Sequence, residues 1–247
     1  MATVKEHYDT HLGNFYSWMM GDMTNRQDEF QNFLIEHELL PRITRNAIDL
    51  GSGHGIQTVP LAKVGYSVKS LDFNIRLLNE LTANTKGMNV EICQADIREI
   101  NRFYGFNPEL IVCCGDTLLH LDNKQDIEQL LHGIANILVE SGKLLLTFRD
   151  YSVPLTGNNR FIPVKSDEDR ILTCVLDYEA DFINVTDLLY EKNTDGWGQK
   201  ISFYRKVRIK PDEIVKIIER NNMTVQYNQT VNKMITIIAC KKYSRPA

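Results

Sequence analysis

The sequence lacks the features that mark a membrane or secreted protein. No uninterrupted apolar run approaches the roughly 20 residues that cross a bilayer, and the longest, Leu110 to Cys114, has the length of a strand. The first residues, Met1 to Glu6, contain no apolar core of a secretory signal. We therefore expect a cytoplasmic protein with no membrane partner.

Excess positive charge is absent as well. The 28 Lys and Arg residues and the 32 Asp and Glu residues give a formal net charge of −4. A chain with this balance has no strong basic field to draw it onto nucleic acid, so we expect no nucleic-acid partner. Apolar residues make up 43% and charged residues 24% of the 247 positions, which is typical of a soluble globular protein. The length suits one large α/β domain, alone or with an insertion.

Cysteine pairs with metal-binding or redox spacing are also missing. The five cysteines are an odd number, and none forms a C-x-x-C pair. Four of them fall in stretches with the pattern of strands, which predicts reduced, buried thiols. His7 and His11 are spaced to share a helix face, but no third ligand stands at a supporting spacing, so no metal is expected. The cysteines are Cys93, Cys113, Cys114, Cys174 and Cys240.

The spacing of apolar residues predicts an α/β frame after an N-terminal helical segment. Residues 6–40 carry apolar positions at helical spacing, which predicts two helices broken near Gly21 and Asp22. From Ala47 onward strands and helices alternate, and this order favours a parallel, doubly wound sheet. The predicted strands are Ala47–Leu50, Ser67–Phe73, Val90–Ala95, Leu110–Cys114 and Lys143–Phe148, and the predicted helices are Gly55–Val64, Ile75–Thr85 and Ile127–Leu138.

The alternation of strands and helices stops after residue 150. Three stretches rich in β-branched and aromatic residues follow one another with no helix between them, and Asn193 to Gly196 predicts the turn between the last two. We expect these antiparallel strands to form a cap over the edge of the sheet. The three strands are Arg170–Tyr178, Phe182–Glu191 and Gln199–Ile209, and they are followed by a predicted helix, Pro211–Asn221, and a last strand, Met234–Cys240.

A glycine-rich loop, Asp49-Leu50-Gly51-Ser52-Gly53-His54-Gly55, lies between the first predicted strand and the first predicted helix after it. Glycine lets the backbone turn sharply and approach a ligand with no Cβ in the way, and the free amides at a helix start can meet the ligand's polar groups. Dinucleotide-binding sites use the same device with the spacing G-x-G-x-x-G. Here the third glycine of that fingerprint is replaced by Ile56, which argues against NAD.

This loop resembles the first motif of class I methyltransferases, an acid followed by Gly-x-Gly-x-Gly, and all four positions match. The resemblance continues to about residue 150 and implies S-adenosylmethionine as the cofactor. Asp72, after the second strand, matches the acid that the family places on the ribose hydroxyls. Asp96, after the third strand, matches the acid that accepts from the adenine amino group, with the amide of Ile97 beside it. All of these positions fall at the carboxyl ends of strands, where open α/β sheets bind ligands.

The resemblance therefore gives a set of expected cofactor residues. An N-terminal aromatic segment is added to them as a lid, although its helical spacing fits an amphipathic helix packed on the core equally well. The expected residues are Asp49, Gly51, Ser52, Gly53, Gly55, Asp72, Phe73, Asp96, Ile97 and Cys114, with Tyr8 and Tyr16 from the lid.

Two further stretches, Gly115 to Leu121 and Phe148 to Tyr151, resemble the glycine and sarcosine N-methyltransferase group. In that group an arginine at the position of Arg149 grips the carboxylate of the amino acid, a role that suits a planar, two-pronged donor. Asp116 stands where the group has asparagine, and an anionic side chain would favour an amine over a carboxylate. Asp116, His120 and Arg149 are the expected catalytic residues. The alternatives are an ion pair of Arg149 with Asp150 and a packed, hydrogen-bonded role for His120.

The expected fold is α/β: a Rossmann-like, doubly wound, mostly parallel seven-stranded sheet with an inserted antiparallel β cap. We expect a helical lid over residues 1–40, a cofactor-binding domain over 41–150 and 211–247, and the cap over 151–210. The favoured function is methyl transfer to an amine nitrogen of a small molecule. A small-molecule O-methyltransferase and a catalytically inactive cofactor-binding protein of the same fold are the alternatives, and the sequence leaves the oligomeric state open.

Overall fold

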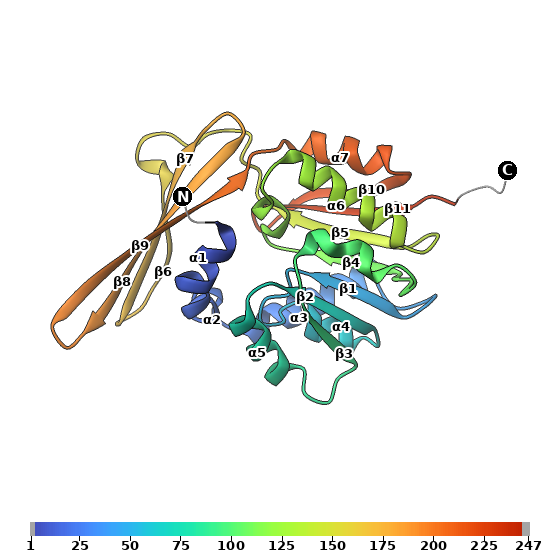
Figure 1. Ribbon diagram of the computed structural model, residues 1–247, viewed down its shortest axis with the longest axis horizontal. Helices are drawn as coiled ribbons and strands as arrows, with labels where there is room; N and C mark the ends of the chain where they lie inside the picture. Colours follow the sequence, from blue (N-terminus) through green and yellow to red (C-terminus); the bar gives the residue numbers. More distant parts are fainter. Residues whose placement is uncertain (1–2, 244–247) are drawn as a thin grey trace.

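The computed structural model describes residues 3–243, which form two β-sheets (Figure 1). Sheet A has seven strands in the order β10-β11-β5-β4-β1-β2-β3, and sheet B has four in the order β6-β7-β8-β9. The helices and strands are, in chain order, α1 (Val4–Thr10), η1 (Leu12–Asn14), α2 (Tyr16–Met20), α3 (Met23–Glu36), β1 (Asn46–Leu50), α4 (Thr58–Lys63), β2 (Ser67–Asp72), α5 (Ile75–Asn84), β3 (Val90–Gln94), η2 (Ile97–Phe103), β4 (Leu110–Cys113), η3 (Thr117–His120), α6 (Lys124–Ile137), β5 (Lys143–Phe148), η4 (Gly157–Arg160), β6 (Phe161–Ser166), β7 (Arg170–Tyr178), β8 (Phe182–Asn193), β9 (Gly196–Val207), α7 (Pro211–Arg220), β10 (Met223–Val231) and β11 (Met234–Lys241).

Sheet A is a Rossmann-like, mostly parallel sheet with helices on both faces. Strands β1 to β5 pair in parallel, whereas β11 runs antiparallel to β5 and β10 antiparallel to β11. In β4 all four residues are buried, as expected of a parallel strand covered on both faces. Ile111 and Cys113 pack in the core beneath α6 and α7, while Leu110 and Val112 pack in the core beneath α3 and α4. The expected seven-stranded fold is confirmed.

Sheet B is the antiparallel insertion that the sequence predicts between β5 and the last helix. Its strands alternate buried and more exposed residues. In β8, Ile183, Val185 and Leu189 are buried, whereas every second residue between them, beginning with Asn184, is partly exposed. One face is therefore a core face and the other is not. The turn between β8 and β9 spans the two residues Thr194 and Asp195, because Asn193 pairs with Gly196.

Several predicted boundaries and elements differ from the structure. The helix after the glycine loop begins at Thr58 rather than Gly55, because Gly51, Gly53 and Gly55 all have positive φ angles that a right-handed helix excludes. The N-terminal segment forms α1, α2 and α3 with a 3₁₀ turn between the first two, not two helices.

Two strands were not predicted, and both lie at an edge of a sheet. Strand β6 contains Pro163, which an edge strand tolerates because one side of it has no hydrogen-bonding neighbour. Strand β10 has polar residues at most of its positions, so its sequence gives a weak strand signal. No disulfide joins the five cysteines, all of which the structure describes. The outermost limits expected for the domains, residues 1 and 247, lie outside the described residues.

Helix α1 lies between the two sheets, where it contacts β9 of sheet B on one side and the loop after β2 of sheet A on the other (Figure 1). Toward sheet B, the fully buried His7 places Nδ1 2.7 Å from Ser202 Oγ and Nε2 3.2 Å from a carboxylate oxygen of Asp187, and its ring stacks on Tyr204 at 4.2 Å. Toward sheet A, Asn74 Nδ2 donates to Asp9 at 2.8 Å. Two polar contacts on opposite sides therefore fix this helix across the gap between the sheets.

Replacing His7 with alanine is expected to lower the free energy of unfolding by about 2 to 4 kcal/mol, because the buried ring, its stack on Tyr204 and its polar contacts with Ser202 and Asp187 would all be lost. Urea denaturation at pH 7 measures the loss. The matched control is Lys5→Ala on the same helix, which removes only the exposed pair with Asp9 and should cost much less. Equal losses in the two variants would show that the His7 contact does not hold the helix.

Candidate functional site

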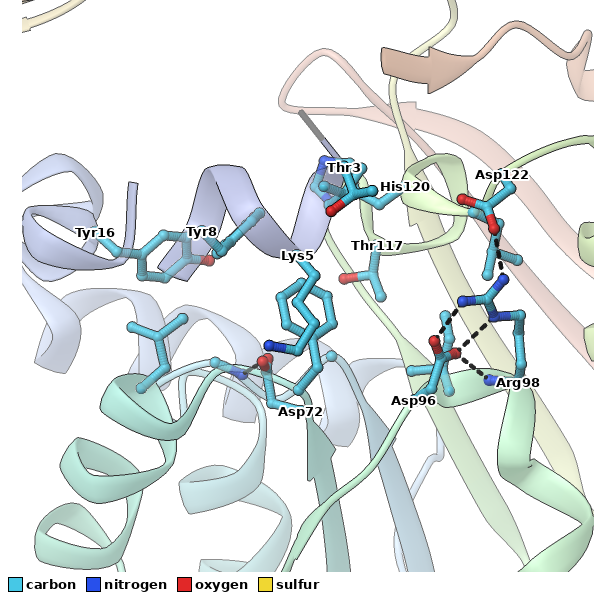
Figure 2. A pocket seen from close by; sticks show the side chains of 17 residues that line it. Thr3, Lys5, Tyr8, Tyr16, Asp72, Asp96, Arg98, Thr117, His120 and Asp122 are labelled. Atoms are coloured by element: carbon cyan, nitrogen blue, oxygen red, sulfur yellow. Dashed lines mark hydrogen bonds and ion pairs between the residues drawn. The ribbon is translucent and has the colours of Figure 1, made fainter. Parts of the chain in front are cut away.

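A cavity of about 320 Å³ lies at the carboxyl ends of the parallel strands of sheet A, beneath helices α1 and α2 (Figure 2). Eight residues that the sequence predicts for a cofactor line it, as does His120. The lining also includes residues that the sequence does not single out, among them Thr3, Val4 and Lys5 of the N-terminal segment. The eight are Tyr8, Tyr16, Gly51, Gly53, Asp72, Phe73, Asp96 and Ile97.

Four of the expected cofactor residues do not line the cavity. Asp49 is buried under the glycine loop, where Thr58 Oγ1 donates to it at 2.6 Å, and burial raises the pKa of Asp49 to about 7. Ser52 is buried, and its hydroxyl has no hydrogen-bond partner among the described residues. Gly55 and Cys114 are also absent from the lining.

The glycines of the loop serve the packing of the protein as well as the cavity. A Cβ on Gly51 would stand 2.4 Å from the methyl group of Thr117, and one on Gly55 would stand 2.7 Å from Leu81. A Cβ on Gly53 would meet only the ring of Tyr16, at 3.6 Å. All three also have positive φ angles, which side chains disfavour. Gly51 and Gly55 are therefore required by neighbouring side chains, and Gly53 leaves bare backbone at the cavity.

Asp72 is the carboxylate at the centre of the cavity wall. It is the last residue of β2 and accepts from the amides of Gly53 and Asn74, each at 2.9 Å, on different oxygens. Burial raises the pKa of Asp72, and the two amides oppose that shift. Because each carboxylate oxygen has a second lone pair, Asp72 can still accept two hydroxyl groups from a ligand.

Asp96 lines the far end of the cavity and is held by Arg98, which sequence reasoning missed. Nε and Nη2 of Arg98 donate to the two carboxylate oxygens at 3.0 and 2.7 Å, and Nη1 donates to Asp122 at 2.6 Å (Figure 2). Burial alone would raise the pKa of Asp96, but these bonds outweigh burial and lower it. Asp96 is thus a fixed anionic acceptor with a planar guanidinium beside it.

The N-terminal lid residues contribute aromatic rings to this cavity. The ring of Tyr8 lies 5.5 Å from that of Phe73 in an edge-on arrangement and 6.1 Å from that of Tyr16. Both tyrosines line the cavity, while the opposite side of α1 packs on sheet B. The helix therefore combines the two interpretations that its sequence allowed, a cover for the cavity and an amphipathic packing element.

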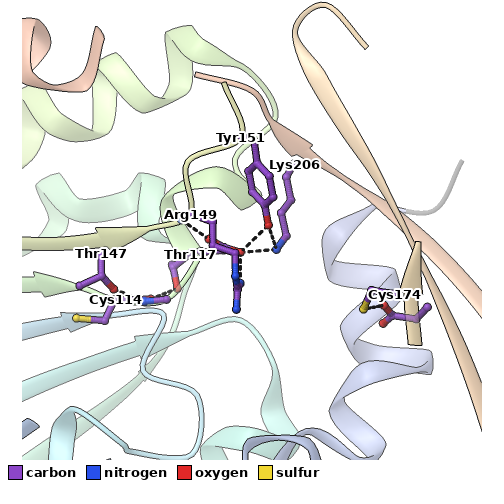
Figure 3. Close-up of polar contacts among 10 residues, drawn as sticks. Cys114, Thr117, Thr147, Arg149, Tyr151, Cys174 and Lys206 are labelled. Carbon is purple, nitrogen blue, oxygen red and sulfur yellow. Dashed lines mark hydrogen bonds and ion pairs between the residues drawn. The ribbon is translucent and has the colours of Figure 1, made fainter. Parts of the chain in front are cut away.

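A second cluster surrounds Asp116, which directly precedes the lining residue Thr117 (Figure 3). The Asp116 carboxylate is almost fully buried and accepts from Lys206 Nζ at 2.6 Å, from Arg149 Nη1 at 2.6 Å and from the Tyr151 hydroxyl at 3.1 Å. The backbone amide of Arg149 donates to its other oxygen at 2.9 Å. Burial would raise the pKa of Asp116, but Lys206 and Arg149 hold it well below its ordinary value.

Lys206 changes the electrostatics that the sequence suggests for this cluster. It comes from β9 of the cap, some 90 residues after Asp116, and no local pattern marks it. One anion with two cations leaves the cluster with a net charge of +1. The sequence suggested that Asp116, in place of asparagine, offers a free negative charge to a cationic group. The structure shows instead that Lys206 and Arg149 already pair with this carboxylate. Arg149 pairs with Asp116, and its side chain stays 55% exposed and points away from Lys206 (Figure 3).

His120 stands between the cavity and this cluster. Its ring lies 5.8 Å from that of Tyr8 and 5.6 Å from that of Tyr204, and its Nε2 is buried without a hydrogen-bond partner among the described residues. Burial, helped by the charge of Lys206, lowers the pKa of His120 to about 3. The imidazole is therefore neutral at pH 7 and offers an acceptor or a donor to a bound molecule, depending on its tautomer.

Within residues 3–243, no three His, Cys, Asp or Glu side chains are grouped closely enough to bind a metal ion. No helix in that part of the chain has both the length and the apolar character needed to cross a membrane.

The sequence and the fold both have relatives among known proteins. Residues 47–142 match a family model described as a methyltransferase domain. The glycine/sarcosine N-methyltransferase of Halorhodospira halochloris is 29% identical over 132 residues, which cover 53% of this chain and 49% of that protein. The protein of the same name from Parasynechococcus marenigrum is 27% identical over 134 residues, 53% of this chain and 46% of that one. The chain spans about half the length of the curated relatives it matches.

Solved structures share the fold over almost the whole chain. The CcbJ methyltransferase from Streptomyces caelestis matches with a TM-score of 0.77 at 14% identity and covers 97% of this chain and 99% of its own. An S-adenosylmethionine-dependent methyltransferase from Clostridium acetobutylicum matches with a TM-score of 0.73 at 17% identity, and the match covers 96% of each chain. The amino pentose methyltransferase CalS10 from Micromonospora echinaspora was solved with S-adenosylmethionine bound. It matches with a TM-score of 0.70 at 12% identity, over 94% of this chain and 97% of its own.

Asp49→Asn tests the buried carboxyl beneath the glycine loop. The pKa of Asp49 is about 7 in the folded protein against an ordinary value of 3.8, so the folded state holds its proton more tightly. The tighter proton binding adds about 4 kcal/mol to the free energy of unfolding. This contribution is fully present below about pH 4 and is lost as the pH rises to about 7. The Asn variant lacks this contribution. The wild-type protein should therefore lose stability relative to the variant between about pH 4 and 7 in urea denaturation, with a constant difference above about pH 7. Parallel curves would contradict the buried, protonated Asp49.

Proposed function

We propose that this chain, which carries a class I S-adenosylmethionine-dependent methyltransferase domain, transfers the cofactor's methyl group to an amine nitrogen of a small molecule. The observation that supports this function most directly is the cavity at the end of sheet A. It presents bare backbone at Gly53, a carboxylate at Asp72 and a second carboxylate at Asp96, in the order of the strands that carry them.

The cavity residues fit the parts of S-adenosylmethionine. Asp72 has lone pairs left for the two ribose hydroxyls, because its backbone partners take only one on each oxygen. Asp96, held in place by Arg98, would accept from the adenine amino group. The rings of Tyr8, Tyr16 and Phe73 would face the sulfonium, which aromatic faces attract as they attract other cations. When bound, the cofactor supplies an activated methyl group with a good leaving group, so the protein's task is alignment and exclusion of water.

The residues beside the cavity favour an amine in its neutral form. A cluster with a net charge of +1 raises the free energy of a nearby ammonium ion and so lowers the pKa of a bound amine. A neutral amine can attack the methyl carbon, and the nitrogen gains a positive charge as the sulfonium becomes a neutral thioether. Neutral His120 would accept from the amine N–H and orient its lone pair toward the methyl group. The product releases its proton to solvent.

The same positive cluster supports a carboxylate on the acceptor. Arg149 uses one nitrogen for Asp116 and leaves its exposed edge for a second carboxylate, which a guanidinium can hold at two points. Lys206 neutralises Asp116, so the aspartate no longer opposes an anionic group. Acceptors that are amino acids are also what the names of the matched glycine/sarcosine N-methyltransferases indicate for those proteins. We therefore propose a small amine that bears a carboxylate as the acceptor.

Asp72→Ala tests the cofactor assignment. We expect the affinity for S-adenosylmethionine, measured by isothermal titration calorimetry, to fall about 100-fold, because two ribose hydroxyls lose a charged acceptor. Asp195→Ala, in the turn between β8 and β9, is the control and should bind the cofactor normally. No binding by the folded wild-type protein, or unchanged affinity in Asp72→Ala, would overturn the cofactor assignment.

Arg149→Lys tests the acceptor. The substitution keeps the charge beside Asp116 but removes the two-pronged donor, so KM for a carboxylate-bearing amine should rise about 10-fold with little change in kcat or in cofactor affinity. Formation of S-adenosylhomocysteine with a panel of amino acids, plain amines and small phenols gives the readout. Plain amines should be unaffected by the substitution. Turnover with phenols alone, or an equal rise in KM for plain amines, would contradict the proposed acceptor.

A further inference from the structure

Sheet B leaves one of its faces uncovered. Its inner face packs on α1 and the rest of the protein, with Leu172, Val185 and Leu189 buried. The opposite face carries Ile171 of β7, which is 41% exposed, and Ile201 of β9, which is 60% exposed. Figure 1 shows α1 on one side of this sheet, and on the other side the described residues place no α-helix, only the four-residue 3₁₀ helix η4 beside the end of β7.

This outer face has no charge over its central part, where aliphatic and aromatic side chains are mixed with a few neutral polar ones. The strand register places nine residues of β7, β8 and β9 in three cross-strand rows, such as Thr173 beside Leu188 beside Ile201. The other two rows are Ile171, Tyr190 and Gln199, and Val175, Thr186 and Phe203. None of the nine carries a charge. Phe161 of the edge strand β6 extends the last row, because it pairs with Val175.

We propose that the outer face of sheet B packs against the same face of a second copy of this chain. Two twisted sheets with apolar faces pack about 10 Å apart and interleave their side chains. An uncharged face meets its own copy with no like charges opposed, whereas a nucleic acid or a strongly charged partner would find no charge there to pair with. Most soluble homo-oligomers use such a self-complementary, two-fold interface.

The size of the face agrees with this occupant. Four strands spaced about 4.8 Å apart, with about six residues of 3.3 Å each, give a planar footprint of about 380 Å² on each copy. Side chains that project from a pleated surface expose more than the planar area, so a pair buries on the order of 1,000 Å². That area reaches the lower limit of specific protein–protein interfaces, which predicts a reversible dimer.

Sedimentation equilibrium of the wild-type chain and three variants tests the proposal. For wild-type protein the average mass should rise from 28.5 kDa toward twice that value as the concentration increases to about 100 µM. Ile201→Lys and Ile171→Lys should keep the mass of a monomer, because each buries a charge in the interface. Ile43→Lys is the matched control: Ile43 is 59% exposed, almost the same as Ile201, but lies before β1 of sheet A, and this variant should dimerise like the wild type.

The pair of lysine variants separates packing of faces from pairing of edges. Ile201 lies on the edge strand β9, whereas Ile171 lies on β7, which has a neighbour on each side. A dimer formed by edge-to-edge pairing of β9 would survive Ile171→Lys, and that result would overturn the proposal. A wild-type protein that stays monomeric up to about 100 µM, or a loss of dimer in Ile43→Lys as well, would do so too. Circular dichroism of the variants confirms that each one is folded.

Discussion

The buried ion pair between Lys206 and Asp116 joins the two sheets of this protein at one site. Asp116 belongs to the loop after β4 of sheet A, and Lys206 belongs to β9 of sheet B. Both groups are largely removed from water, so Lys206 stays charged because Asp116 faces it, and Asp116 stays charged because Lys206 and Arg149 both face it. Because Arg149 and Tyr151 bond to the same carboxylate, the pair also fixes the start of the loop that leads from β5 into the cap. The cluster that we propose for the acceptor therefore forms only where the cap meets sheet A.

The cofactor side depends on a different kind of constraint. Asp72 is held by two backbone amides from separate loops, and Asp96 is held by a neighbouring arginine. Each carboxylate is positioned before any ligand arrives, which reduces the conformational freedom that binding must remove. Helix α1 covers this arrangement and is tied to sheet B through His7 and to the start of α5, beside sheet A, through Asp9. A movement of the cap would therefore also move the cover of the cavity, so the two halves of the site are mechanically connected.

The sequence predicted the frame of the fold, and eight of the residues that it predicted for the cofactor line the cavity, because those signals are local. Strand β4 is a short apolar run, and the glycine loop, Asp72 and Asp96 each follow a strand at a fixed position along the chain. The edge strands β6 and β10 were missed, since a strand with one free edge tolerates proline and polar residues. The packing roles of Gly51 and Gly55 were not predicted, because the side chains that need their missing Cβ atoms, Thr117 and Leu81, are distant in sequence.

The sequence by itself determined the parallel α/β sheet, the cap and the row of acids at the strand ends, because periodicity and motif spacing act within a few residues. Tertiary structure alone decided the charge beside the cavity, since Lys206 reaches Asp116 only when strands 90 residues apart are folded together. It also decided the protonation of His120, whose low pKa comes from burial among residues of three separate segments. Charge and burial in a site depend on what lies close in space, and a list of residues does not contain that information.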